Sequence, residues 1–168
     1  MTGTAADRFV LVAGVGNLLR SDDGVGVHAV RAMQAEPLPA GTYLFDGGTA
    51  AWATADAARH AARVIVIDAV EAGASPGTVH VVEGERLAEI APHLTLHSPG
   101  VVEALVMSGD AGALKRLTVI GVEPASLDCG MDLSAPVQAA LPEVVRLARD
   151  RAAEWLAAQG ASEQGEAR

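Results

Sequence analysis

Short apolar runs rich in β-branched residues alternate along the chain with alanine-rich amphipathic segments, and this alternation constrains the fold more than any other feature. The apolar runs predict strands at residues 8–15, 42–46, 63–70, 78–84 and 116–123. The amphipathic segments predict helices at residues 23–34, 49–60, 98–108 and 134–159. Strands that alternate with helices pair in parallel and are covered by helices on both faces of the sheet.

One connection departs from this pattern. Only EAGASPG, residues 71–77, separates the third strand from the fourth, and this is too short for the crossover between parallel neighbours. The fourth strand is therefore predicted to be antiparallel and to lie near an edge of the sheet. The predicted fold class is α/β, a three-layer α/β/α sandwich around a mostly parallel five-stranded sheet.

The length predicts the domain organisation. A chain of 168 residues is expected to form a single domain, here residues 1–160, followed by a polar tail at 161–168 that frays. Ser134 is predicted to cap the last helix and Gly160 to end it. Pro142 lies inside that segment and predicts either a kink or a later start of the helix.

Composition restricts the classes of partner. The formal net charge of -9 argues against binding to nucleic acid or to an anionic membrane surface. No apolar run approaches the roughly 20 residues of a membrane span, and the first residues lack the pattern of a signal peptide. A single cysteine, Cys129, leaves no internal disulfide and suits a reducing compartment. We therefore expect a soluble, cytoplasmic protein.

The first predicted strand leads into the glycine turn GVGNLLRSDDGVG, residues 14–26. A dinucleotide-binding turn reads G-x-G-x-x-G, but the third glycine position is occupied by Leu19. Asp22 and Asp23 also place negative charge at the start of the following helix, where a phosphate would bind. Either acid would serve as a helix cap, yet a pair flanked by glycines favours a functional role.

Acidic residues follow the carboxyl ends of four predicted strands. Asp23 comes after the first strand, and the second, third and fifth strands end at Asp46, Asp68 and Glu123. Because parallel strands share one carboxyl edge, these acids are expected to converge, with His97 within reach of the same edge. Two carboxylates and one imidazole form a ligand set suited to a divalent metal with open positions. A simple turn role competes for Asp46.

Five segments carry a resemblance to a known family. They read VAGVGNLLRSDDGVGVHAV, FDGGTA, VIVIDAVEAGASPGTV, LHSPGVVEAL and LTVIGVEPASLDCGMDLSAPV. Together they resemble the hydrogenase maturation proteases, endopeptidases that trim the large-subunit precursor of nickel–iron hydrogenases. The resemblance extends from Phe9 to about Leu156.

The resemblance implies that Asp23, Asp68 and His97 bind a metal. Asp23 stands where many members have glutamate, so Asp22 is a rival for that ligand, and His93 is a rival for His97. The resemblance further implies that the metal is nickel already inserted in the precursor, so that the acids read out cofactor loading. Other divalent cations can occupy such a site in crystals.

The catalytic group is left open by the sequence. Neither H-E-x-x-H nor G-x-S-x-G is present, and Cys129 is interpreted as an incidental small residue. Peptide hydrolysis would use the nickel to polarise the scissile carbonyl or to activate water. Alternatively, Asp46 or Asp23 would act as a general base. Two other classes of function compete: a metal-binding adaptor without catalysis, and a Rossmann-like nucleotide-binding protein that uses Gly14, Gly16 and Asp46.

Overall fold

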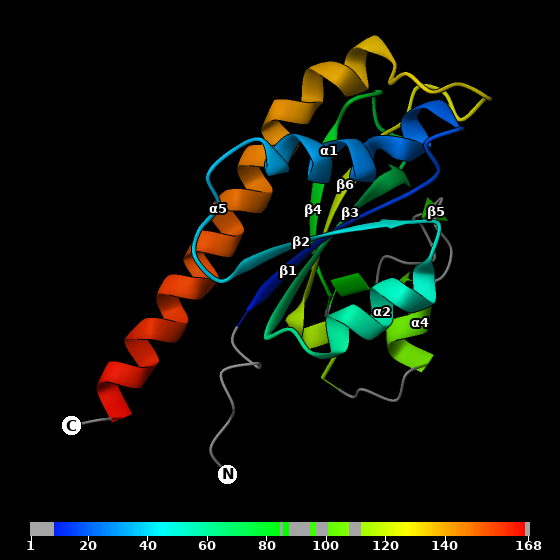
Figure 1. Ribbon diagram of the computed structural model, residues 1–168. Coiled ribbons are helices and arrows are strands. Elements are labelled where there is room, and N and C mark those ends of the chain that lie inside the picture. The colour runs from blue at the N-terminus through cyan, green and yellow to red at the C-terminus, as the bar shows by residue number, and fades with distance from the viewer. Residues whose placement is uncertain (1–8, 85, 88–94, 97–100, 108–111, 167–168) are drawn as a thin grey trace.

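The computed structural model describes residues 9–84, 86–87, 95–96, 101–107 and 112–166. A twisted sheet lies at its centre, with the strand order β2-β1-β3-β6-β4 (Figure 1). Four strands run parallel to one another: β1 (Val10–Val15), β2 (Thr42–Gly48), β3 (Arg63–Glu71) and β6 (Leu117–Val122). The edge strand β4 (Val79–Glu83) pairs antiparallel with β6. The predicted α/β class and the antiparallel strand are therefore confirmed.

A short strand was not predicted. β5 (Thr95–Leu96) pairs antiparallel with the end of β3, with Leu96 opposite Val70 and Thr95 opposite Glu71. Two residues are too few to produce the alternation by which longer strands are recognised in a sequence.

Helices cover the two faces of the sheet and make it a three-layer sandwich. α1 (Val25–Gln34) and α5 (Ala135–Glu166) pack on one face, and α2 (Ala51–Arg59) and α4 (Val101–Met107) pack on the other (Figure 1). Two short 3-10 helices, η2 (Ser21–Gly24) and η4 (Leu114–Arg116), precede α1 and β6.

Each strand contributes side chains to both cores. In β1, Val10 and Val12 face α1 and α5, whereas Leu11 packs with the residues of α2 and α4. All residues of β1 and β6 are buried. A strand that is buried on both faces needs a nearly continuous apolar run, and the segments of β1 and β6 are such runs.

The last helix differs from its predicted bounds. Ser134 does precede it, and its carbonyl oxygen accepts the first helical hydrogen bond from Gln138, at 2.8 Å. The helix then continues through both Pro142 and Gly160 to Glu166, so the later start and the predicted end were wrong. Burial of Val144 and other apolar residues on the sheet outweighs the roughly 3 kcal/mol of an internal proline. Glycine costs a helix only about 1 kcal/mol.

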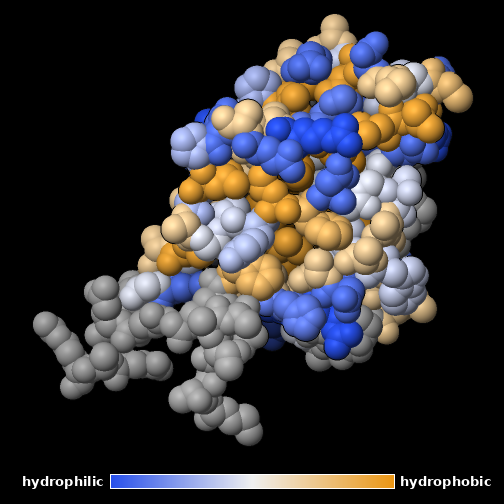
Figure 2. Space-filling model, viewed as in Figure 1, coloured by the Kyte–Doolittle hydropathy of each residue, from blue (hydrophilic) through white to orange (hydrophobic). Residues whose placement is uncertain are grey.

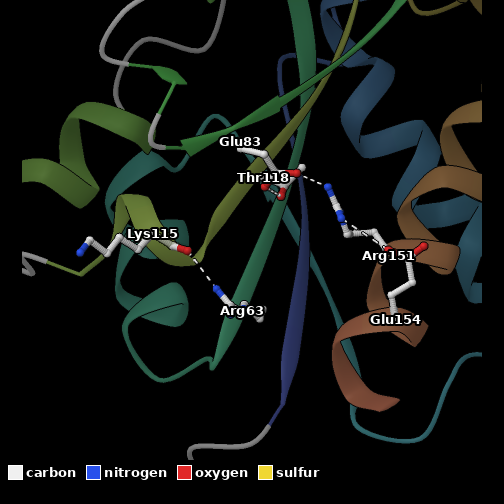
Figure 3. A network of polar contacts seen from close by, with 6 residues as sticks. All are labelled: Arg63, Glu83, Lys115, Thr118, Arg151 and Glu154. Carbon is white, nitrogen blue, oxygen red and sulfur yellow. Dashed lines mark hydrogen bonds and ion pairs between the residues drawn. The ribbon is translucent and has the colours of Figure 1, made fainter. Parts of the chain in front are cut away.

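Polar contacts fasten α5 to the antiparallel edge of the sheet (Figure 3). Oε2 of Glu83 accepts a hydrogen bond from the buried hydroxyl of Thr118 at 2.8 Å, and Oε1 pairs with the guanidinium of Arg151. Glu83 thus joins β4 to both β6 and α5. In the part of the chain that the structure describes, no helix is both long enough and apolar enough to cross a membrane.

Candidate active site

Glycines allow η2 and the start of α1 to lie directly against the sheet. Gly16 has a φ of +123°, and a Cβ at this position would lie 1.7 Å from the carbonyl oxygen of Asp23. A Cβ at Gly26 would lie 2.1 Å from the carbonyl oxygen of Ile67, which belongs to β3. No side chain fits at either position. The turn therefore brings η2, with its two aspartates, beside β3.

Asp23 is the most informative residue of this region. Its side chain is buried, with only 3% of the residue exposed. Oδ2 accepts a hydrogen bond from the backbone N–H of Asn17 at 2.9 Å, whereas Oδ1 is buried and has no hydrogen-bond partner among the described residues. A buried carboxylate oxygen without a partner is unfavourable, and a cation beside it would offset that penalty.

Asp68 lies on the adjacent strand. It is 2% exposed, and its Oδ1 accepts a hydrogen bond from the N–H of Ala69 at 2.8 Å. The sequence placed it at the end of β3, but the strand continues to Glu71. Because η2 packs against β3, the segments that carry Asp23 and Asp68 meet as expected. Their role as metal ligands stays a prediction.

The third predicted ligand, His97, and its rival His93 lie outside the described residues. The described chain reaches Leu96, which pairs with Val70 two residues beyond Asp68. In the described ranges, no group of three or more His, Cys, Asp or Glu side chains is arranged to hold a metal ion. The proposed ligand set would be completed by a residue outside those ranges.

Asp22 has a different role from its neighbour. It is fully buried, and Oδ2 accepts hydrogen bonds from the N–H groups of Ala125 and Ser126 at 2.8 and 3.0 Å. Oδ1 accepts a third from the N–H of Ser134 at 2.7 Å. Both oxygens are thus engaged by backbone donors. This geometry favours Asp23 over Asp22 as the acid that would face a metal.

The other acids at this edge are placed differently. Asp46, at the carboxyl end of β2, is exposed and forms an ion pair with Arg31 of α1 at 3.2 Å. Glu123 is 5% exposed, and its carboxylate accepts hydrogen bonds from the N–H groups of Ala72 and Gly73 at 2.9 and 3.1 Å. Glu123 therefore holds the loop after β3 in place. The parallel strands do share one carboxyl edge, whereas the convergence of the four acids on a single site stays a prediction.

The surface beside η2 carries exposed apolar side chains. Leu19 and Met131 are 62% and 67% exposed. The N–H of Gly130, next to Met131, donates to the carbonyl oxygen of Leu19 at 3.1 Å, so the two segments adjoin. Figure 2 shows apolar surface at the upper right, over the end of the molecule where Figure 1 places η2 and the segment before α5. Cys129 is exposed in the same segment.

Comparisons with known proteins define the class. A family model for hydrogenase maturation proteases matches residues 27–151. The hydrogenase 2 maturation protease of Escherichia coli is 33% identical over 156 residues, which cover 86% of this chain and 93% of that protein. The hydrogenase expression/formation protein HupD of Rhizobium leguminosarum is 36% identical over 163 residues, covering 94% of this chain and 81% of that protein.

Solved structures agree. The hydrogenase maturating endopeptidase HybD of Escherichia coli has a TM-score of 0.72 at 30% identity, over 83% of this chain and 88% of that one. HybD of Thermococcus kodakarensis, a [NiFe] hydrogenase maturation protease, has a TM-score of 0.72 at 29% identity, over 86% and 99%. The fold and these relatives define an endopeptidase. The chain belongs to the hydrogenase maturation protease family, which sets aside the nucleotide-binding and adaptor alternatives.

Proposed function

We propose that this protein removes the C-terminal peptide from the large-subunit precursor of a nickel–iron hydrogenase after nickel has been inserted. The buried, unpartnered Oδ1 of Asp23 carries this proposal. It lies beside the strand that bears Asp68, in a chain whose relatives are named hydrogenase maturation proteases. The reaction is proposed to take place in the cytoplasm, which suits a protein with one unpaired cysteine.

In this proposal, nickel belongs to the substrate and serves as the recognition element. Asp23, Asp68 and His97 would contact it when the precursor docks. The first two are buried carboxylates, so a cation brought beside them experiences little screening by water. Two opposite unit charges at 4 Å attract by about 4 kcal/mol at an effective dielectric constant of 20. An attraction of this size is enough to distinguish a nickel-loaded precursor from a nickel-free one.

A protein substrate also suits the surroundings of the site. Leu19 and Met131 expose apolar surface beside η2, and such surface is typical of protein–protein contacts. The net charge of -9 would disfavour an acidic substrate segment near the site.

Two schemes describe the hydrolysis. In the first, the nickel of the substrate polarises the scissile carbonyl or activates the attacking water. In the second, a carboxylate takes a proton from water, the oxygen attacks the carbonyl, and the proton passes to the leaving amine. Asp46, which is exposed at the same edge, or Asp23 would be that carboxylate.

The decisive experiment compares nickel-loaded precursor with nickel-free precursor. Each form is incubated with the protein, and loss of the C-terminal peptide is followed by intact mass. We expect the loaded form to be trimmed and the nickel-free form to stay intact. Equal trimming of both forms would show that nickel is not the recognition element, and loss of mass from neither form would contradict the proposed substrate.

A further inference from the structure

The segment between β6 and α5, residues 123–134, is attached to the turn that precedes α1. The N–H of Gly130 donates to the carbonyl oxygen of Leu19 at 3.1 Å, and the N–H of Asp22 donates to that of Ser126 at 3.2 Å. These backbone contacts join parts of the chain more than 100 residues apart in sequence. They place the segment alongside η2.

The side chain of Asp22 completes this attachment. Its carboxylate accepts three hydrogen bonds from backbone N–H groups of the segment, at Ala125, Ser126 and Ser134, at 2.8, 3.0 and 2.7 Å. The residue is fully buried, and an ionised carboxylate is an acceptor only, so it is well matched to three donors. Hydrogen bonds to a charged acceptor are about twice as strong as those between neutral groups.

The backbone just before Asp22 is in an unusual conformation. Ser21 has a φ of +46°, in the left-handed region that non-glycine residues rarely adopt. Such a conformation persists only where the surroundings hold it. The N–H of Ser21 donates to the carbonyl oxygen of Gly130 at 2.8 Å. The segment therefore holds Ser21 directly, and it also holds the next residue, Asp22, through the bonds described above.

We infer that Asp22 is a positioning residue: it clamps residues 123–134 onto η2 and thereby fixes the direction of the neighbouring Asp23 carboxylate. This inference rests on the proposed function, in which Asp23 contacts the metal. The N–H of Asp23 donates to the carbonyl oxygen of Arg20 at 3.1 Å, and its Oδ2 is held by Asn17. With η2 clamped, the unpartnered Oδ1 keeps a single direction. Two adjacent carboxylates thus have complementary tasks.

Asp22→Asn tests the clamp with almost no change in shape. The amide group of asparagine would present N–H donors where the carboxylate accepts, so at least one of the three backbone N–H groups would lose its acceptor. Asp132→Asn is the matched control, because Asp132 is exposed in the same segment and the variant has the same change in charge. Asp23→Asn serves as the variant that removes the proposed ligand itself.

Two measurements on the full chain separate the roles. Amide hydrogen exchange at Ala125, Ser126 and Ser134 reports the clamp, and calorimetric titration with cadmium, as a probe ion, reports the metal site. In Asp22→Asn we expect exchange at these amides to rise at least about tenfold, with cadmium binding weaker by about tenfold but still at one ion per chain. Asp23→Asn should keep the amides protected and lose cadmium. Asp132→Asn should resemble the wild type.

Three results would overturn the inference. If the amides stay protected in Asp22→Asn, there is no clamp. If that variant loses cadmium as completely as Asp23→Asn while the amides stay protected, Asp22 is itself a ligand. If exchange at these amides rises but the affinity for cadmium is unchanged, Asp22 supports the fold and does not position Asp23. Should wild-type protein bind no cadmium, the proposed metal contact fails, whereas the exchange rates still decide the clamp.

A second variant covers the case in which Asp22→Asn does not fold. Ala125→Pro removes one N–H donor and leaves the carboxylate intact. Under the clamp, cadmium binding weakens in this variant, because Asp23 is less well directed. If Asp22 were a ligand, loss of one of the two N–H donors to its Oδ2 would leave cadmium binding unchanged or strengthen it, and that result would contradict the inference.

Discussion

At the residue scale, two buried aspartates with different partners face the same edge of the sheet. Oδ1 of Asp68 accepts an N–H bond from Ala69, and Oδ1 of Asp23 has no partner among the described residues. A carboxylate held in such surroundings attracts a cation more strongly than it would in water. Charge rather than shape is therefore the property that these residues are expected to contribute.

Asp68→Asn tests whether the site needs the charge of Asp68, because the variant removes the charge and nearly preserves the shape of the side chain. The amide oxygen can still accept the bond from Ala69, so we expect the variant to fold, but a neutral amide binds a cation more weakly. Trimming of nickel-loaded precursor should fall at least about tenfold, which corresponds to ~1.4 kcal/mol of transition-state stabilisation. A melting curve beside a time course of trimming makes the measurement, with the exposed Asp150→Asn as control. A folded Asp68→Asn protein with the normal rate would remove Asp68 from the site.

Asp46→Asn distinguishes the two hydrolysis schemes. The ion pair with Arg31 is exposed, so its loss should change the free energy of unfolding by no more than about 1 kcal/mol. If Asp46 is the general base, trimming falls by about 100-fold or more, and this is the result we expect. Arg31→Gln is the matched control, because it breaks the same ion pair and keeps the carboxylate. Normal trimming by Asp46→Asn would favour the nickel-based scheme or Asp23.

At the scale of elements, the close approach of α1 to the sheet depends on glycine. A Cβ at Gly26 would lie 2.1 and 2.4 Å from the carbonyl oxygens of Ile67 and Val15, both backbone atoms that cannot move aside alone. Gly160 in α5 is the opposite case, since nothing lies within 4 Å of a Cβ at that position. The same substitution should thus have opposite effects on stability at the two positions.

We expect Gly26→Ala to lower the free energy of unfolding by several kcal/mol, in the range of severe overpacking. Gly160→Ala should raise it by up to about 1 kcal/mol, because alanine is the better helix former. Urea unfolding followed by circular dichroism measures both. A Gly26→Ala protein as stable as the wild type would show that α1 can shift away from β3 without penalty.

At this scale, the sequence alone predicted some of the elements and missed others. Strands buried on both faces were evident as apolar runs, and the seven-residue connection revealed the antiparallel β4. The end of α5 was not evident, because a glycine costs a helix only about 1 kcal/mol and does not by itself end it. The clamp of Asp22 was not predictable either. Its donors lie 103 to 112 residues further along the chain, and no local pattern reports such contacts.

At the scale of the whole molecule, two apolar cores share one sheet. Val10, Ile65 and Ile120 belong to the core beneath α1 and α5, whereas Leu11, Val66 and Val119 belong to the core beneath α2 and α4. Because neighbouring residues of the same strands supply both cores, a helix layer that detaches exposes apolar side chains of the strands that also support the opposite layer. The molecule is therefore expected to unfold as one cooperative unit.

The two tryptophans allow a direct test of this cooperativity, because Trp52 lies in α2 and Trp155 in α5, on opposite layers. The variants Trp52→Phe and Trp155→Phe each leave one fluorescent reporter. In each, urea unfolding by fluorescence and by circular dichroism should coincide. Adding Ile65→Val, which perturbs only the α1 and α5 core, should lower the free energy of unfolding by about 1 kcal/mol for both reporters. A shift confined to the Trp155 reporter would show that the two layers unfold independently.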